Sequence, residues 1–166
     1  MTTPVPGNGR HIETPTQFQH DDGSGDQQLL AALDQFATDP TTFAELLSAL
    51  ARSRLLVPVV AVLDEADDSG ADKSSHMATV TLVQPGGRRG LLAFTSQESL
   101  ARWDPTARPV PAMAISVAAA SIAEHADGVL IDVAGPTPFV IDGPALQSLA
   151  EARGPTSPPG HPEAPL

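Results

Sequence analysis

Apolar residues in this chain recur at two different spacings, and the spacing changes several times along residues 26–153. Stretches with an apolar residue every three or four positions are typical of helices, whereas continuous or alternating apolar runs are typical of strands. A chain with both patterns has to bury helix faces against a sheet, and 166 residues suit one core of this kind. The sequence therefore predicts a single α+β domain, in which helices pack against a mixed sheet of about five strands.

Two helices are predicted at the start of this region. Asp26 is suited to cap the first helix, because its side chain can accept hydrogen bonds from amides of the first turn, and Leu29 begins the apolar face. Asp39 and Pro40 are suited to begin the second helix, whose apolar residues within 43–50 share one face. We expect these two helices to form a hairpin.

Three strands are predicted next, at residues 55–63, 77–83 and 91–94. The first is a continuous apolar run that contains Pro58, which favours a sheet edge or a bulge because proline has no N–H for a ladder. An edge position would permit self-association of two copies. Residues 85–87, a proline followed by two glycines, join the other two strands and predict a β-hairpin.

Shorter elements are predicted in the second half of the chain. Thr95 and Glu98 have the spacing of a capping box and predict a short helix that carries Trp103. The remaining elements, in order, are a connector or short strand at 109–115, a helix at 116–126 that Gly128 ends, strands at 129–133 and 139–141, and a helix from Gly143.

Both ends of the chain have compositions typical of disordered segments. Residues 1–25 are rich in proline, glycine and polar side chains, and bury too little apolar area to offset the entropy cost of ordering. Residues 154–166 are rich in proline, which favours an extended chain. We therefore expect a disordered N-terminal arm at 1–25, a folded domain at 26–153 and a disordered tail at 154–166.

The chain is strongly acidic, with a formal net charge of −11. This charge repels nucleic-acid phosphates and anionic lipids, so we expect neither nucleic acid nor a membrane as a partner. No run approaches the roughly 18 apolar residues of a membrane-spanning helix, and the N-terminus lacks the basic and apolar regions of a signal peptide. We expect a cytoplasmic protein.

The sequence predicts no catalytic, cofactor-binding or metal-binding set. Cysteine is absent and the five histidines are scattered, whereas metal sites need clustered ligands. The acidic segment 64–72 has Ala66 at the third position of an EF-hand register, so we interpret it as a solvated loop, with weak divalent-cation binding as the alternative. No Gly-x-Ser-x-Gly elbow is present. We therefore expect neither enzyme activity nor a cofactor.

Arg88, Arg89 and Trp103 are the candidate interaction residues. The two arginines lie in a glycine-rich turn, which favours a solvated turn, with an anion or partner contact as the alternative. Trp103 favours core packing, with an interface anchor as the alternative.

Three segments of the chain resemble one protein family. They are LVP at 56–58, GLLAFTSQESL at 90–100 with Trp103 beyond it, and ADGVLIDVAGP at 126–136. In order and spacing they resemble the SseB N-terminal domain, of the enhanced serine sensitivity type, over residues 29–152. The richness in alanine, proline and glycine with few lysines is similar to actinobacterial proteins. The resemblance implies no catalytic residue and no cofactor.

Two functions are consistent with these observations. The first is a non-enzymatic protein-interaction or regulatory domain, whose protein partner is unknown and could be a second copy of the chain. The alternative is a small-molecule domain that binds an amino-acid metabolite or is weakly catalytic. It would use Thr95, Ser96 and Asp132, because ligands commonly bind at strand ends.

Overall fold

The structure is a computed structural model that describes residues 4–6, 18–63 and 75–152. Both helices and strands form along these residues, and the predicted α+β fold with a mixed sheet is confirmed. The elements are β1 (Pro4–Pro6), α1 (Gln27–Thr38), the 3₁₀ turn η2 (Pro40–Thr42), α2 (Phe43–Arg52), β2 (Arg54–Leu63), β3 (Ser75–Val83), β4 (Arg89–Ala93), α3 (Gln97–Trp103), β5 (Arg108–Met113), α4 (Ala114–Ala123), β6 (Gly128–Ile131), β7 (Phe139–Asp142) and α5 (Gly143–Glu151).

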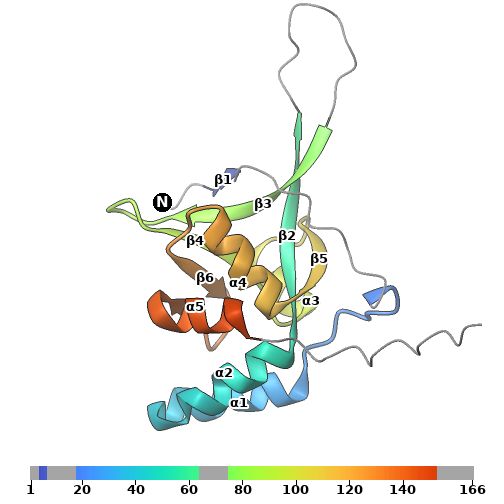
Figure 1. The fold of residues 1–166 in the computed structure, drawn as a ribbon. Helices are drawn as coiled ribbons and strands as arrows, with labels where there is room; N and C mark the ends of the chain where they lie inside the picture. The colour runs from blue at the N-terminus through green and yellow to red at the C-terminus, as the bar shows by residue number, and fades with distance from the viewer. Residues whose placement is uncertain (1–3, 7–17, 64–74, 153–166) are drawn as a thin grey trace, which may run out of the picture.

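Six strands follow one another across the sheet in the order β5-β2-β3-β4-β6-β7, and β1 pairs with β3 beside this path. Neighbouring strands are antiparallel except for β4 and β6, which are parallel. The path has one strand more than expected, because the segment interpreted as a connector or short strand is the strand β5. Figure 1 shows β2 and β3 extending beyond the rest of the sheet.

The expectation that Pro58 marks a sheet edge is wrong. The strand β2 lies between β5 and β3, and Leu56 exchanges two backbone hydrogen bonds with Phe94, of 2.7 and 2.8 Å. Residues two apart direct their backbone groups to the same side, so the Pro58 nitrogen also faces β4 and β3. Pairing with β3 begins only at Val59, so the proline lies where β2 changes partners. With both sides paired, β2 offers no edge for self-association.

The edge of the sheet at β5 is protected by two other prolines. Pro109 opposes Pro58 and Pro111 opposes Leu56 in the antiparallel register. Because Leu56 and Pro58 direct their backbone groups away from β5, these are non-hydrogen-bonded pairs, and both β5 prolines direct their nitrogens outward. Proline at such positions hinders the addition of another strand, so this edge is closed.

The two faces of the sheet are covered unequally. The first face packs against α1, α2, α4 and α5, which supply eleven of the twenty buried residues of the larger core. The second face packs against α3, through Leu100 and the half-buried Trp103. In Figure 1, α4 and α5 lie in front of the sheet and α3 lies behind it. None of the helices in the described part of the chain has the length and apolar character needed to cross a bilayer.

The helical hairpin of α1 and α2 attaches to the edge strand β7 through aromatic rings. The centroid of the Phe36 ring lies 5.7 Å from that of Phe43 and 5.6 Å from that of Phe139, the first residue of β7. Such distances are typical of stabilising aromatic pairs.

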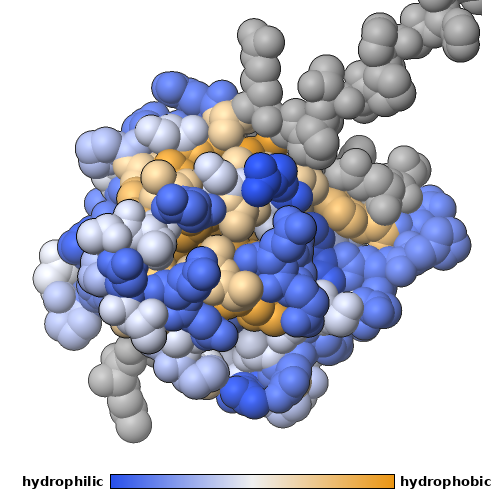
Figure 2. Space-filling view, turned by 90° about the horizontal axis from the view of Figure 1, so that it is seen from below, coloured by the Kyte–Doolittle hydropathy of each residue, from blue (hydrophilic) through white to orange (hydrophobic). Residues whose placement is uncertain are grey.

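Seen from below, apolar residues are visible in the middle of the molecule and hydrophilic residues surround them (Figure 2).

The expected cap at Asp26 is confirmed, whereas Asp39 caps the turn η2 and the residue before α2 is Thr42. The Asp26 carboxylate accepts hydrogen bonds from the amides of Gln28 at 2.8 Å and Leu29 at 3.3 Å. The Asp39 carboxylate accepts one from the amide of Thr41 at 3.0 Å, in the turn η2 that leads into α2. The β-hairpin of β3 and β4 is also confirmed, and its turn is closed by the Gly87 amide and the Gln84 carbonyl at 2.9 Å.

Two expected helix ends are wrong. The short helix α3 is capped by Ser96 and Ser99, whose side chains each accept a hydrogen bond from the other residue's amide, at 3.1 and 3.2 Å. Thr95 therefore is not its cap, because the start of the helix lies one residue later than the spacing indicated. Gly128 does not end α4; the helix ends before His125, which has a positive φ of 56°, and Gly128 begins β6.

The close packing of β4 on β6 predicts a specific cost for a methyl group at Gly90. A Cβ built there would lie 2.5 Å from Leu130 Cγ. We expect Gly90→Ala to lower the free energy of unfolding by about 2 kcal/mol, measured by urea denaturation. The matched control is Gly90→Ala in a Leu130→Ala background, where the clash is removed and the added cost should fall by about 1 kcal/mol or more. Additive costs would contradict this interpretation.

Candidate functional site

Two hollows on the described surface are lined by charged side chains. The first, of about 410 Å³, lies where the N-terminal segment meets β2, and we call it the N-terminal hollow. Its lining residues are Phe18, His20, Asp21, Asp22, Ser24, Gly25, Asp26 and Arg54. The second, of about 260 Å³, lies beside the β3–β4 turn, and we call it the hairpin hollow. Its lining residues are Gln84, Arg88, Arg89, Gly90, Asp127, Gly128, Val140 and Asp142.

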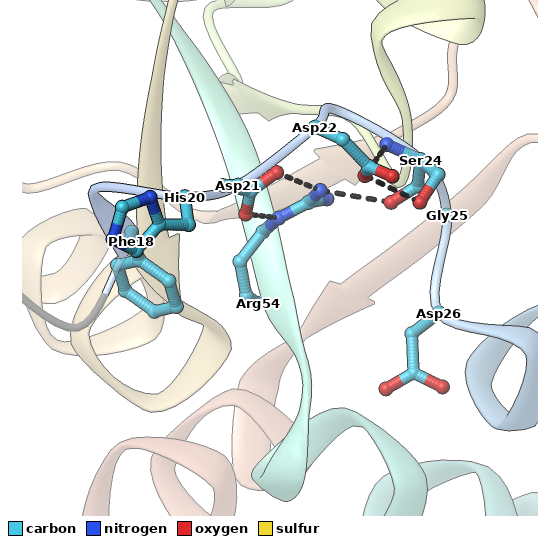
Figure 3. Close-up of a pocket in the computed structure, with 8 residues that line it drawn as sticks. All are labelled: Phe18, His20, Asp21, Asp22, Ser24, Gly25, Asp26 and Arg54. Atoms are coloured by element: carbon cyan, nitrogen blue, oxygen red, sulfur yellow. Dashed lines mark hydrogen bonds and ion pairs between the residues drawn. The ribbon is translucent and has the colours of Figure 1, made fainter.

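Arg54 forms the centre of the N-terminal hollow (Figure 3). Its Nε and Nη2 groups donate to the two carboxylate oxygens of Asp21. Nη2 also donates to the Ser24 carbonyl at 2.8 Å, and Nη1 donates to the Thr95 carbonyl at 2.9 Å. The Arg54 and Asp21 side chains are only 11% and 12% exposed. We call this set of contacts the Arg54 clasp; it joins the N-terminal segment to β2 and to the end of β4.

The Arg54 clasp includes residues of the N-terminal segment that composition placed in an arm. Composition placed residues 1–25 in a disordered arm, but residues 18–25 are described and contact the rest of the domain. The Gly23 carbonyl accepts a hydrogen bond from the Gln97 amide at 2.7 Å, and the Gly23 amide donates to Asp21 Oδ1 at 2.8 Å. Asp21 and Ser24, which composition assigns to a solvated arm, accept hydrogen bonds from Arg54 instead. The tail at 154–166 and the acidic segment 64–72 lie outside the described residues.

Thr95 and Asp132, two of the predicted strand-end residues, lie together where the parallel strands β4 and β6 end. The Thr95 amide donates to Asp132 Oδ1 at 2.9 Å, and the Thr95 hydroxyl donates to Oδ2 at 2.6 Å. Both residues are buried, and the Asp132 amide donates to the Ala93 carbonyl at 3.1 Å. Ser96, the third strand-end residue, caps α3. The polar groups of all three residues thus serve contacts within the protein.

Arg88 and Arg89 both line the hairpin hollow. Arg88 Nη2 lies 2.7 Å from Asp142 Oδ2, in an ion pair whose side chains are 62% and 46% exposed. The Arg89 amide donates to Asp127 Oδ2 at 2.7 Å, and the Asp127 amide donates to the Arg89 carbonyl at 2.8 Å. Asp127, before β6, and Asp142, at the end of β7, therefore contact the hairpin, whose turn residues are exposed.

Apolar surface lies beside these charges. Val140, in the middle of β7, is 50% exposed and opposes Leu130 in the β6–β7 register. Gly90 and Gly128 oppose each other in β4 and β6, and both line the hollow without contributing a side chain. The hairpin hollow thus combines an exposed apolar residue with an ion pair at its rim.

Trp103, the third candidate interaction residue, lies away from the hairpin hollow. Its ring centroid is 5.6 Å from that of Phe94, and it packs, half-buried, against the core of the second sheet face. The residues that sequence reasoning missed are Arg54, Asp21, Asp142 and Val140. The only signal for Arg54 was a lone charge directly before a long apolar run. Asp142 and Val140 gave none, because their contacts depend on sheet register.

Among the described residues, no three histidines, aspartates or glutamates lie close enough together to hold a metal ion. His20 lines the N-terminal hollow and His125 follows α4, so the two are in different parts of the fold. His11 and His161 lie outside the described residues.

The Arg54 clasp predicts that Arg54 contributes strongly to stability. Arg54→Leu would leave the mostly buried Asp21 carboxylate without a charge partner and with the Gly23 amide as its remaining donor, so we expect the free energy of unfolding to fall by about 3 kcal/mol. Arg54→Lys should recover part of this loss, because an ammonium group cannot reproduce the bidentate contact. The control is Arg102→Leu, whose ion pair with Glu98 is exposed and should matter by less than about 1 kcal/mol. Urea denaturation measures each value, and equal losses at both arginines would contradict the prediction.

The same contact predicts a pH dependence. The hydrogen bond from the Arg54 side chain lowers the pKa of Asp21 below its ordinary value of 3.8. A carboxylate with a lowered folded pKa stabilises the fold fully above its unfolded pKa, and this contribution is lost as the pH falls through the folded value. The stability difference between the wild type and Asp21→Asn should therefore be constant near neutral pH and shrink below about pH 4.

Urea denaturation at a series of pH values measures this difference. In an Arg54→Leu background the advantage of Asp21 over asparagine should disappear at every pH. If it persists there, Arg54 is not the origin of the effect.

Comparison with known proteins adds the family. Residues 27–148 match the SseB protein N-terminal domain, and the match runs from the first residues of α1 into α5. No curated protein and no solved structure matches the chain. The matched residues include both ends of the Thr95–Asp132 contact, Arg54 and the whole hairpin hollow. Because they make up most of its length, the chain belongs to the family of the SseB protein N-terminal domain.

Proposed function

We propose that this SseB-family domain is a non-enzymatic protein-interaction domain, and that its partner binds at the hairpin hollow. The observation that carries the proposal is the exposed Val140 beside the ion pair of Arg88 and Asp142. An apolar centre next to a polar rim is the usual anatomy of a protein–protein interface. Arg88 and Arg89, taken from the sequence as candidate interaction residues, lie in this hollow.

The uneven covering of the sheet supports this location. Four helices pack on the first face, whereas the second face packs against the seven-residue helix α3. Val140 and Leu130 are opposed and share the second face, yet Leu130 is 8% exposed and Val140 is 50% exposed. The covering therefore ends between β6 and β7, and the apolar surface beyond it is open to a partner.

The size and lining of the hollow favour a protein partner over a small molecule. Small-molecule pockets commonly measure about 300–1,000 Å³ and enclose most of the ligand. The hairpin hollow is smaller, at about 260 Å³, and two glycines are among its lining residues. The net charge of −11 disfavours nucleic acid and anionic membranes as partners, so we propose a protein.

The small-molecule alternative at Thr95, Ser96 and Asp132 has less support. Both carboxylate oxygens of Asp132 accept hydrogen bonds from Thr95, and Ser96 caps α3. A ligand at this strand end would have to displace contacts between β4 and β6. Stabilisation of the full chain by an amino acid in a thermal-shift panel, lost in Asp132→Asn, would favour the alternative.

The proposal predicts that a charge at Val140 abolishes binding. The tagged chain is used to capture proteins from the native host, and the captured proteins are quantified by mass spectrometry. A carboxylate buried without a partner costs several kcal/mol, so Val140→Glu should reduce recovery of a specific partner by more than about tenfold.

Val60→Glu is the matched control, because Val60 is the other large apolar residue among those described that is clearly exposed, at 40%, and it lies on the extended part of β2. It should leave recovery unchanged. The same proteins recovered with wild type and Val140→Glu, or an equal loss with both variants, would contradict the hairpin hollow as the binding site.

A further inference from the structure

The backbone of β7 has an outward-facing donor and acceptor at Val140. The Asp132 amide donates to Ala93 of β4, so the amide of the preceding residue, Ile131, faces the opposite side, toward β7. Ile131 opposes Phe139, and these two residues therefore form a hydrogen-bonded pair. Val140 follows Phe139, so its N–H and C=O point away from β6. In the described part of the chain no strand pairs with β7 on that side.

The two edges of the sheet differ in their capacity to accept another strand. At β5 the outward nitrogens of Pro109 and Pro111 carry no hydrogen and hinder pairing. The strand β7 contains no proline, and its outward amides belong to Val140 and, two residues on, Asp142. Edge strands with free N–H and C=O groups are templates for an additional strand. Of the two ends of the sheet path, β7 is therefore the one open to pairing.

The side chain of Val140 adds selectivity to this edge. Side chains alternate between the two faces along a strand, so Val140 lies on the second face with Leu130, and the hairpin hollow extends from it to Asp142 and Arg88. A strand added beside β7 would direct alternate side chains to the same face. One of them would contact Val140, and a neighbour two positions away would reach the Arg88–Asp142 ion pair.

We propose that the partner binds through an extended peptide segment that pairs with β7 as an added strand. This inference rests on the proposed function and specifies its partner class. Main-chain hydrogen bonds to Val140 supply affinity, and the hairpin hollow selects an apolar side chain flanked by a charged one. This is recognition by strand addition, in which alternate side chains enter pockets beside the edge.

The area available at β7 favours a peptide over a second copy of the chain. The strand has four residues, and Val140 is its one exposed large apolar side chain. Stable interfaces between folded proteins bury about 1,200–2,000 Å², far more than two such strands would supply. A short peptide needs only the strand and the hollow beside it.

Selection of a displayed library of short random peptides against the full chain tests the proposal. Enriched peptides are measured by fluorescence anisotropy against wild type, Val140→Pro and Val140→Thr. Proline keeps an apolar side chain, removes the outward N–H and is tolerated at an edge position, so we expect binding to weaken by more than about tenfold. Threonine keeps the N–H and the branched shape and should bind within a few-fold of wild type. Equal binding to wild type and Val140→Pro would overturn strand addition.

Amide hydrogen exchange on the wild type provides a measurement that does not depend on folding of a variant. Addition of an enriched peptide should slow exchange of the Val140 amide, while the Val60 amide serves as an internal comparison. Unchanged exchange at Val140 would overturn the proposal. A concentration-dependent dimer that Val140→Pro abolishes, seen by sedimentation, would identify the occupant as a second copy and would also overturn it.

The natural partner distinguishes this inference from the proposed function. Recovery by Val140→Pro but not by Val140→Glu would overturn strand addition and leave the hairpin hollow as the binding site. Recovery by both variants would overturn both. Loss with both variants, at unchanged thermal stability of Val140→Pro, is the result that the proposal expects.

Discussion

A guanidinium group removed from water has to be matched by acceptors, and Arg54 meets this requirement with three residues from two separate parts of the chain. It binds Asp21 and the Ser24 carbonyl in the N-terminal segment, and the Thr95 carbonyl after β4. Thr95 in turn binds Asp132, which follows β6. One continuous line of polar contacts therefore crosses the sheet at the end where β4 and β6 finish. Without Arg54, the Asp21 carboxylate and the Ser24 and Thr95 carbonyls would each lose a donor that makes their burial tolerable.

This line of contacts also determines which part of the sheet is open to function. In α/β sheets, ligands commonly bind beyond the carboxyl ends of parallel strands. Here that position is filled by Thr95, Asp132 and the cap of α3, so the protein's own side chains occupy it. The opposite ends of β4 and β6 are held by the contacts of Arg89 with Asp127, next to the hairpin hollow. The hollow is therefore the more accessible of the two ends.

Sequence periodicity predicted the elements well, because local patterns determine them. The caps at Asp26 and Asp39 and the turn between β3 and β4 depend on residues within a few positions of one another. Pro58 was wrongly interpreted as a sign of a sheet edge, because the place where β2 changes partners inside the sheet accommodates proline as well as an edge does. Thr95 fits a capping box as well as Ser96 does, and only the long-range contact with Asp132 decides between them. In the hairpin hollow, the sequence indicated the two arginines but not the residues they contact, since Arg88 and Asp142 are 54 residues apart.

The β5 edge of the sheet is closed and the β7 edge is open for different chemical reasons. This difference bears most directly on function. The β5 edge is closed by two prolines at alternate positions, Pro109 and Pro111. In the register with β2, the nitrogens of both prolines face outward. The strand β7 itself contains no proline, and Val140, which is 50% exposed, directs its backbone N–H and C=O outward there. Exposed apolar edges favour aggregation unless something limits them. The strand β7 is limited by its length of four residues and by the charged pair beside it, which allow a short, matched segment to pair while offering little to a long or unmatched one.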